Sequence, residues 1–110
     1  EGWQSPPSSE KRLDLLRGST EVILAKDEQG VLIGFVTAIT DGVLAASIPL
    51  LEVIPSMRGQ GVGTELLRRM LERLAGFYMV DVVCDSELVP FYSRFGLRES
   101  TAMIRRRVAD

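Results

Sequence analysis

The hydrophobic residues of this chain change their spacing at Gly61, and this change limits the folds that it can adopt. Before Gly61, apolar residues come in three short, dense runs that are typical of β-strands. After it, they recur every three or four residues, which is the spacing of one face of an α-helix. These helical positions are Val62, Leu66, Leu67, Met70, Leu71 and Leu74. The sequence therefore predicts a sheet that leads through a turn into an amphipathic helix.

The three runs before Gly61 predict a hairpin and a third strand. Glu21–Lys26 and residues 31–40 flank the turn signal "DEQG", so we expect these two segments to pair antiparallel. After the dipeptide Asp41-Gly42, residues 43–53 supply the third strand, which contains Pro49. Because proline has no N–H to donate to a neighbouring strand, Pro49 predicts either a bulge or an unpaired edge position.

Shorter elements surround this central part. We expect a short helix from residue 9 to about residue 17, and Gly76 ends the long helix. A fourth strand at residues 78–84, a short helix from about residue 85 to 94 and a last strand at residues 103–108 follow. This order predicts an α+β, or mixed α/β, fold. The 110 residues predict one domain, 1–110, with an N-terminal segment at 1–18 and a core at 19–110.

The composition excludes several classes of function. The chain has no histidine, which rules out a Ser-His-Asp or Cys-His nucleophile and a histidine-bound metal site, and we predict no metal. The formal net charge of −2 argues against a surface built for nucleic acid. No apolar run approaches the roughly 18 residues that span a membrane. Cys84 is the only cysteine, which fits a reducing, cytoplasmic setting.

Glycine is dense in the turn before the long helix, "IPSMRGQGVGT", where Gly59, Gly61 and Gly63 alternate. A Walker loop needs a lysine after its last glycine, and a dinucleotide fingerprint needs glycine at Thr64 or Leu66, so neither pattern is met. A glycine turn into a helix start still exposes N–H groups and the positive end of the helix dipole, and it can bind an anion. The alternative is a tight turn that binds nothing.

Two motifs together resemble the GNAT superfamily of N-acetyltransferases. The first is "LEVIPSMRGQGVGTELLRRML", whose matching residues are Val53, Pro55, Arg58, Gly61 and Gly63. The second is "VVCDSELVPFYSRFGLRES", whose matching residues are Phe91, Tyr92, Gly96 and Leu97. The resemblance covers about residues 21–107. It implies a mostly antiparallel, twisted sheet that splays around a V-shaped acetyl-CoA cleft, with helices flanking the sheet.

The resemblance implies that main-chain groups hold acetyl-CoA, the acetyl donor. The pyrophosphate would lie on the backbone amides of Arg58, Gly59, Gln60, Gly61, Val62, Gly63 and Thr64, which explains the missing lysine. The arm of the donor would pair with the strand at Leu51 and Val53, and would meet Asp85, Phe91 and Tyr92 of the second motif. A bulge near Pro49 would part this strand from residues 78–84 and leave a gap for the thioester.

The resemblance also implies direct transfer of the acetyl group to an amine. Tyr92 matches the family tyrosine that often protonates the leaving thiolate, a role for which a hydroxyl less acidic than a thiol is suited. The alternative is that Tyr92 only packs beside Phe91. Glu52 could accept the proton of the amine, directly or through water, or could instead face solvent or bind the acceptor. Asp41 and Asp81 are weaker candidates for this base.

We therefore expect an acetyl-CoA-dependent N-acetyltransferase that acts on a primary amine of a small molecule or a protein, and a homodimer stays open. Asp85 stands where the family often has asparagine, and Leu88 where a small residue is common. These departures support an alternative function, that of a non-catalytic acyl-CoA-binding sensor or assembly module with the same fold. The family also begins with a strand and one or two helices before the hairpin. We expect either a shortened member or a first strand and helix upstream of Glu1.

Overall fold

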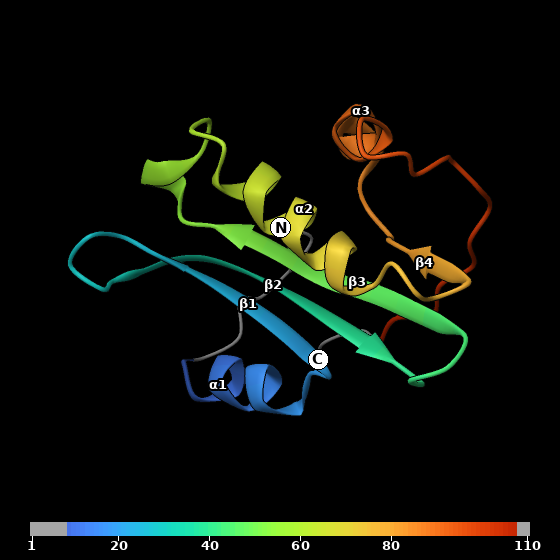
Figure 1. Ribbon diagram of the computed structural model, residues 1–110, viewed down its shortest axis with the longest axis horizontal. Helices are drawn as coiled ribbons and strands as arrows, with labels where there is room; N and C mark the ends of the chain where they lie inside the picture. Colours follow the sequence, from blue (N-terminus) through green and yellow to red (C-terminus); the bar gives the residue numbers. More distant parts are fainter. Residues whose placement is uncertain (1–8, 108–110) are drawn as a thin grey trace.

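The structure is a computed structural model that describes residues 9–107, as a sheet with helices on both of its faces (Figure 1). Its α-helices are α1 (Ser9–Gly18), α2 (Val62–Arg73) and α3 (Val89–Ser93). Its strands are β1 (Glu21–Lys26), β2 (Leu32–Thr40), β3 (Ala45–Val53) and β4 (Met79–Asp81). Two short 3-10 helices are η1 (Pro55–Met57) and η2 (Ser86–Leu88). This arrangement confirms the predicted mixed α+β class.

The four strands lie in the order in which the chain forms them. β1 pairs antiparallel with β2, β2 pairs antiparallel with β3, and β3 pairs parallel with β4. The predicted hairpin between β1 and β2 is confirmed. The Asp27 carboxylate accepts hydrogen bonds from the backbone N–H groups of Gln29 and Val31, both at 2.9 Å, and closes the turn. An aspartate that bonds its own following backbone is a common way to hold such a turn.

The predicted irregularity at Pro49 is a bulge in β3. Thr37 pairs with Leu50, whereas Ile39 pairs with Ser47, so one residue of β2 lies opposite Ile48 and Pro49 together. The parallel pairing of β3 with β4 ends at the same level, because its last pair is Ser47 with Asp81. Since a bulge bends a strand and sharpens its twist, it accounts for the parting of β3 from β4 beyond this point.

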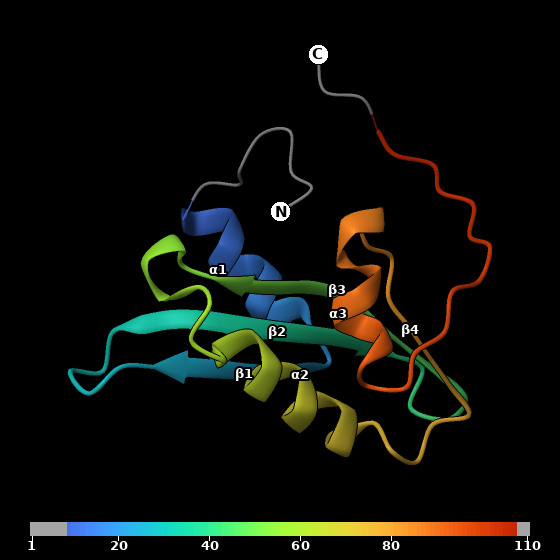
Figure 2. The same cartoon turned by 90° about the horizontal axis from the view of Figure 1, so that it is seen from above.

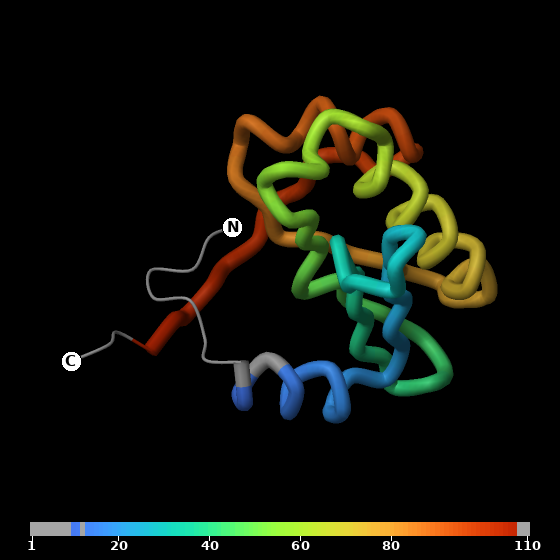
Figure 3. The backbone as a smooth tube through the Cα atoms, turned by 90° about the vertical axis from the view of Figure 1, so that its left-hand side faces the viewer, coloured from blue at the N-terminus to red at the C-terminus, as the bar shows by residue number. Residues whose placement is uncertain are grey.

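The core lies between the sheet and α2. The helix contributes the buried residues Leu66, Leu67 and Met70, and the residue after it, Leu74, is buried with them. The sheet contributes the buried side chains of Ile23, Val36, Ala38, Ala46 and Ile48. Burying a side chain of this size contributes about 1.5–3 kcal/mol, so this layer dominates the stability. The helix α1 lies across the opposite face of the sheet (Figures 2 and 3).

Two predicted strands differ from the structure. The fourth strand is only Met79–Asp81 instead of residues 78–84, because its partner β3 bends away after Ser47. The last strand, predicted at residues 103–108, is wrong for residues 103–107, which are exposed and outside regular structure (Figure 2). Strand-forming residues need neighbours to pack against, and this segment pairs with no described strand. Residue 108 and residues 1–8 of the predicted N-terminal segment lie outside the described residues.

The predicted long helix is confirmed from Val62, and the predicted short helix near residue 90 forms as η2 followed by α3. Pro90 stands in the first turn of α3, where a missing N–H does no harm. Within residues 9–107, no helix combines the length and the apolar character that crossing a membrane requires.

Candidate functional site

The glycine turn leaves β3 through η1 and enters α2 with two residues in the left-handed backbone region. Gly59 has a φ of 79° and Gly61 a φ of 85°, and Gly61 caps the start of α2. Residues other than glycine rarely adopt such φ angles, so the backbone path of the turn explains why glycine stands at these two positions. No atom lies within 4 Å of the place where a Cβ would stand on either of them, so both face open space.

Gly63 needs a different explanation, because neither backbone angle nor packing requires it. It lies in the first turn of α2 outside the left-handed region, and an added Cβ would meet only Val53 at 3.7 Å, an ordinary contact. A glycine inside a helix costs up to about 1 kcal/mol relative to alanine. Neither the backbone nor the packing around Gly63 explains why the helix carries this loss of stability. The glycine therefore indicates that a molecule outside the chain approaches the backbone closely here.

Not all backbone amides of this turn are available to a ligand, because the N–H of Arg58, which was predicted to bind the pyrophosphate, donates to the carbonyl oxygen of Pro55 at 3.3 Å. The first hydrogen bond inside α2 runs from the N–H of Glu65 to the carbonyl oxygen of Gly61, at 3.0 Å. The N–H groups of Val62, Gly63 and Thr64 precede it and have no acceptor within the helix. Together with the positive end of the helix dipole, three such groups form a site for an anion.

Arg58 lies against the end of β3. Its Nε donates a hydrogen bond to the carbonyl oxygen of Val53 at 3.1 Å, and its side chain is exposed. This contact places a guanidinium charge between the strand and the start of α2. A charged donor here strengthens the attraction of the turn for an anion.

One edge of β3 is open beyond the bulge. The N–H of Ile54 donates to the carbonyl oxygen of Ile33 at 2.8 Å, and the register continues as Val53 with Gly34 and Leu51 with Val36. In an antiparallel pair, residues bonded to the partner strand alternate with residues that point away from it. The main-chain groups of Leu51 and Val53 therefore point to the edge that faces away from β2, where no described strand pairs with them.

The side chain of Glu52 lies on the other face of the sheet from α2. Leu51 and Val53 pack against the core under α2, and neighbouring side chains of a strand point to opposite faces. Glu52 also pairs across the sheet with Phe35, on the face covered by α1. The carboxylate is half-buried. The candidate base and the glycine turn thus lie on either side of β3.

Sequence reasoning missed Gly34, which sets how closely β2 approaches this part of β3. A Cβ on Gly34 would lie 2.8 Å from the carbonyl oxygen of Glu52 and 3.2 Å from the side chain of Leu66. Real Cβ atoms do not come so close to a backbone oxygen, so this position holds the strand pair together only as glycine. A glycine inside a predicted strand was the available signal, since it often marks a close approach of two backbones.

Phe91 and Tyr92 lie on α3 and are half-buried against the core. Their rings meet edge to face, with centroids 5.1 Å apart, and the guanidinium of Arg94 lies 5.4 Å from the centre of the Phe91 ring. Asp85 is exposed at the start of η2, where its carbonyl oxygen accepts from the N–H of Leu88 at 2.9 Å and its side chain makes no capping bond.

These features agree with a comparison with known proteins. The model of the acetyltransferase (GNAT) family matches residues 1–97, which is most of the chain. The chain belongs to the GNAT acetyltransferase family. An acetyltransferase implies an acceptor for the acetyl group, and the fold described above is the fold of its GNAT relatives.

Two solved structures and one curated protein illustrate the likeness. The GNAT chain is 50% identical to a candidate acetyltransferase from Deinococcus radiodurans, with a TM-score of 0.91, over 97% of this chain and 75% of that one. It is 26% identical to a GNAT family protein from Streptococcus pneumoniae, with a TM-score of 0.77, over 91% and 80% of the two chains. An uncharacterized N-acetyltransferase of Pyropia yezoensis is 25% identical over 99 residues. The chain covers 57% of the length of this curated relative, and the match covers 86% of the chain.

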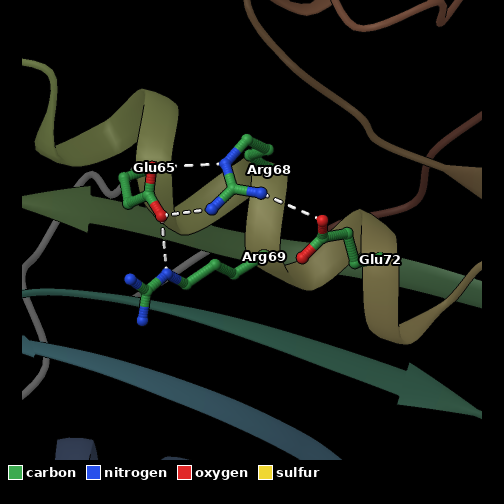
Figure 4. A network of polar contacts seen from close by, with 4 residues as sticks. All are labelled: Glu65, Arg68, Arg69 and Glu72. Carbon is green, nitrogen blue, oxygen red and sulfur yellow. Dashed lines mark hydrogen bonds and ion pairs between the residues drawn. The ribbon is translucent and has the colours of Figure 1, made fainter.

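A network of charged side chains follows the first turn of α2 in this GNAT domain (Figure 4). Glu65 accepts from Arg69 at 2.6 Å and from Arg68, and Arg68 also donates to Glu72 at 2.9 Å. Hydrogen bonds from the two arginines lower the pKa of Glu65 to about 2. The positive charge beside this carboxylate offsets the repulsion that it would exert on an anion at the start of the helix.

The remaining candidates have structural roles. The Asp41 carboxylate accepts from the N–H groups of Val43 and Leu44 at 2.8 Å each, and these bonds lower its pKa and fix the turn before β3. Asp81 accepts from the hydroxyl of Ser47 at 2.8 Å, at the last pair of β3 with β4. Burial raises the pKa of the Cys84 thiol, so it is a poor nucleophile. Within residues 9–107, no group of three or more metal-ligating side chains comes together.

Proposed function

We propose that this GNAT chain is an N-acetyltransferase that uses acetyl-CoA and a primary amine, the amine belonging to a small molecule or a protein. The observation that carries the proposal is the glycine turn into α2. The N–H groups of Val62, Gly63 and Thr64 have no acceptor within α2, and Gly63 has no internal reason to be a glycine. The residues therefore fit a ligand with a pyrophosphate group that approaches the backbone closely.

A second feature supports a ligand of this length. The open edge of β3 begins beyond the bulge at Pro49 and ends beside Arg58 and the turn. We propose that Leu51 and Val53 bind the amide-containing arm of acetyl-CoA through their main-chain groups, as an added strand would. The turn at residues 58–64 binds the pyrophosphate, and Phe91 and Tyr92 contact the arm from α3. Asp85 is the weakest member of this set, because an ionised carboxylate accepts but cannot donate.

Bound acetyl-CoA supplies an activated acetyl group, whose bond to sulfur breaks as a bond to the amine nitrogen forms. Glu52 accepts the proton that the amine loses, directly or through one water. Tyr92 donates the proton that the sulfur gains, and a phenol can do this because it keeps its proton at neutral pH and is close in acidity to a thiol. The positions of the two groups support opposite roles, since Glu52 lies on the α1 face and Tyr92 packs on the α2 face.

Binding of acetyl-CoA is tested by thermal unfolding. A ligand present at 100 times its dissociation constant should stabilise the protein by about 2.7 kcal/mol. Gly63→Glu should abolish this stabilisation, because a carboxylate would occupy the place of the pyrophosphate. The free variant should stay folded, since the added Cβ makes an ordinary contact and an acidic residue suits the first turn of a helix. Gly76→Glu carries the same charge outside the turn and should bind normally. Lack of any shift with millimolar acetyl-CoA would refute the proposal.

Catalysis is tested by Tyr92→Phe with a panel of primary amines and a measurement of CoA release. The variant should bind acetyl-CoA as the wild type does, while transfer falls by about 10²–10⁴-fold, the usual contribution of a general acid. If the wild type binds acetyl-CoA and never acetylates any amine, the chain is the non-catalytic acyl-CoA-binding module that the departures at Asp85 and Leu88 suggest.

A further inference from the structure

A cavity lies on the face of the sheet opposite α2, between the end of α1 and the bulge in β3. Its volume is about 360 Å³, and it is lined by Leu15, Gly18, Ser19, Ile39, Pro49 and Leu50. Five of these six residues offer only apolar or main-chain surface. The hydroxyl of Ser19 donates to the carbonyl oxygen of Leu15 at 2.8 Å, so it already has a partner inside the chain.

This cavity shares a face of the sheet with Glu52. Thr37 pairs with Leu50 and Phe35 pairs with Glu52, and Thr37 and Phe35 are two residues apart on one strand. Leu50 and Glu52 therefore point the same way and stand about 7 Å apart along β3. An apolar hollow with a half-buried carboxylate two residues beyond its lining residue Leu50 matches a molecule that carries a positive charge at one end and an apolar group at the other.

The two sides of β3 would bind different substrates of the proposed reaction, the acetyl donor on one side and the acceptor on the other. The glycine turn lies at the start of α2 on one side, and the register of β2 with β3 places the cavity and Glu52 on the other. An acceptor that approaches from the α1 side meets the carboxylate first and reaches the region where β3 and β4 part. The amine nitrogen of the acceptor then lies next to Glu52, and the rest of the acceptor binds in the cavity.

We propose, on the basis of the proposed function, that the acceptor is a primary amine joined by a short spacer to an alkyl or aryl group, and that this group binds in the cavity. Polar amines such as amino alcohols leave the cavity unfilled and bind weakly. Ile39, which is 54% exposed, and Leu50 determine this preference, because they form the sheet side of the cavity.

The test compares 2-phenylethylamine with ethanolamine, two primary amines of similar basicity that differ in their apolar group. Initial rates of CoA release at saturating acetyl-CoA give kcat and KM for each. We expect kcat/KM to be at least about 10-fold higher for 2-phenylethylamine, mainly through KM, which is the discrimination that even small apolar groups achieve. Thermal shift with each amine measures binding without turnover, and 2-phenylethylamine should give the larger shift.

Ile39→Ser tests the cavity with little risk to folding, because the side chain is more than half exposed. The ratio of the two kcat/KM values should fall by about 10-fold or more in this variant. It should stay unchanged in Val43→Ser, which removes an 81% exposed apolar side chain outside the cavity.

The outcomes separate this inference from the proposed function. If acetyl-CoA stabilises the protein but the two amines are used equally, or neither amine binds, the apolar acceptor is refuted and donor binding stands. A ratio that does not change in Ile39→Ser also refutes the role of the cavity. If acetyl-CoA does not bind at all, both proposals fail.

Discussion

Gly34→Ala adds a single methyl group at the point where β2 lies closest to β3. The new Cβ would stand 2.8 Å from the carbonyl oxygen of Glu52, 3.2 Å from Leu66 and 3.4 Å from Val53. The flexible end of Leu66 can move aside, but the backbone oxygen cannot. We therefore expect the strand pair to separate locally, directly behind the open edge of β3.

The size of the effect follows from two opposing contributions. Inserting a methyl group into a well-packed interior costs about 1–3 kcal/mol. Replacing glycine by alanine also restricts the unfolded chain, which offsets about 0.4–1 kcal/mol of that cost. The net loss should be roughly 1–2 kcal/mol, which lowers the Tm by roughly 4–15 °C in a domain of this size.

Differential scanning calorimetry or thermal unfolding by circular dichroism measures this loss. Gly76→Ala is the matched control, since no atom lies within 4 Å of its Cβ position and its backbone is outside the left-handed region. This control should be as stable as the wild type or slightly more stable. Equal Tm values for Gly34→Ala and Gly76→Ala would show that the close approach does not constrain position 34.

Two further predictions concern charge and reactivity. Glu65→Gln should lower stability slightly at pH 7, because the hydrogen bonds from Arg68 and Arg69 hold the pKa of this carboxyl at about 2 in the folded protein, below its ordinary value of 4.5. Such a group stabilises the fold above pH 4.5 and stops doing so as the pH falls through 2, so the Tm curves of the variant and the wild type should converge in strong acid. Cys84 should react slowly with a disulfide reagent in the folded protein and quickly in denaturant, because burial raises its pKa. Cys84→Ala should keep full transferase activity, and a loss of transfer with normal binding of acetyl-CoA would contradict the conclusion that its thiol is not a nucleophile in the reaction.

Local patterns in the sequence predict most of the fold. The helical spacing of Leu66, Leu67 and Met70 places α2, and the turn signal that starts at Asp27 places the first hairpin. Both depend on residues close together in the chain, so no knowledge of distant contacts is needed. The last strand could not be predicted in this way, because Met103 and Ile104 form a strand only if another strand lies beside them.

The same distinction between local patterns and distant contacts applies to the candidate site. The residues of the glycine turn are consecutive, so the motif alone identifies their proposed role. The family resemblance names Leu51 and Val53, but the direction of their main-chain groups depends on which residues of β3 bond to β2, and this is seen only in the register. The apolar cavity also escapes the sequence, because it joins α1 to β2 and β3, segments that lie far apart in the chain.

The bulge at Pro49 acts as a phase shift in β3. A strand presents its residues alternately to two faces, and a shift of one residue exchanges every side chain beyond it. If the strand kept Pro49 but ran as a regular ladder, Glu52 would turn toward the apolar layer under α2 and Leu51 toward α1, whereas deleting Pro49 would leave Leu50 opposite Thr37 and both faces as they are. One inserted residue thus lets a single continuous strand be structural in its first half and present a carboxylate and an open edge in its second. An insertion of one residue between Leu50 and Val53 should consequently be less tolerated than a substitution there, because it would exchange the faces of the residues beyond it.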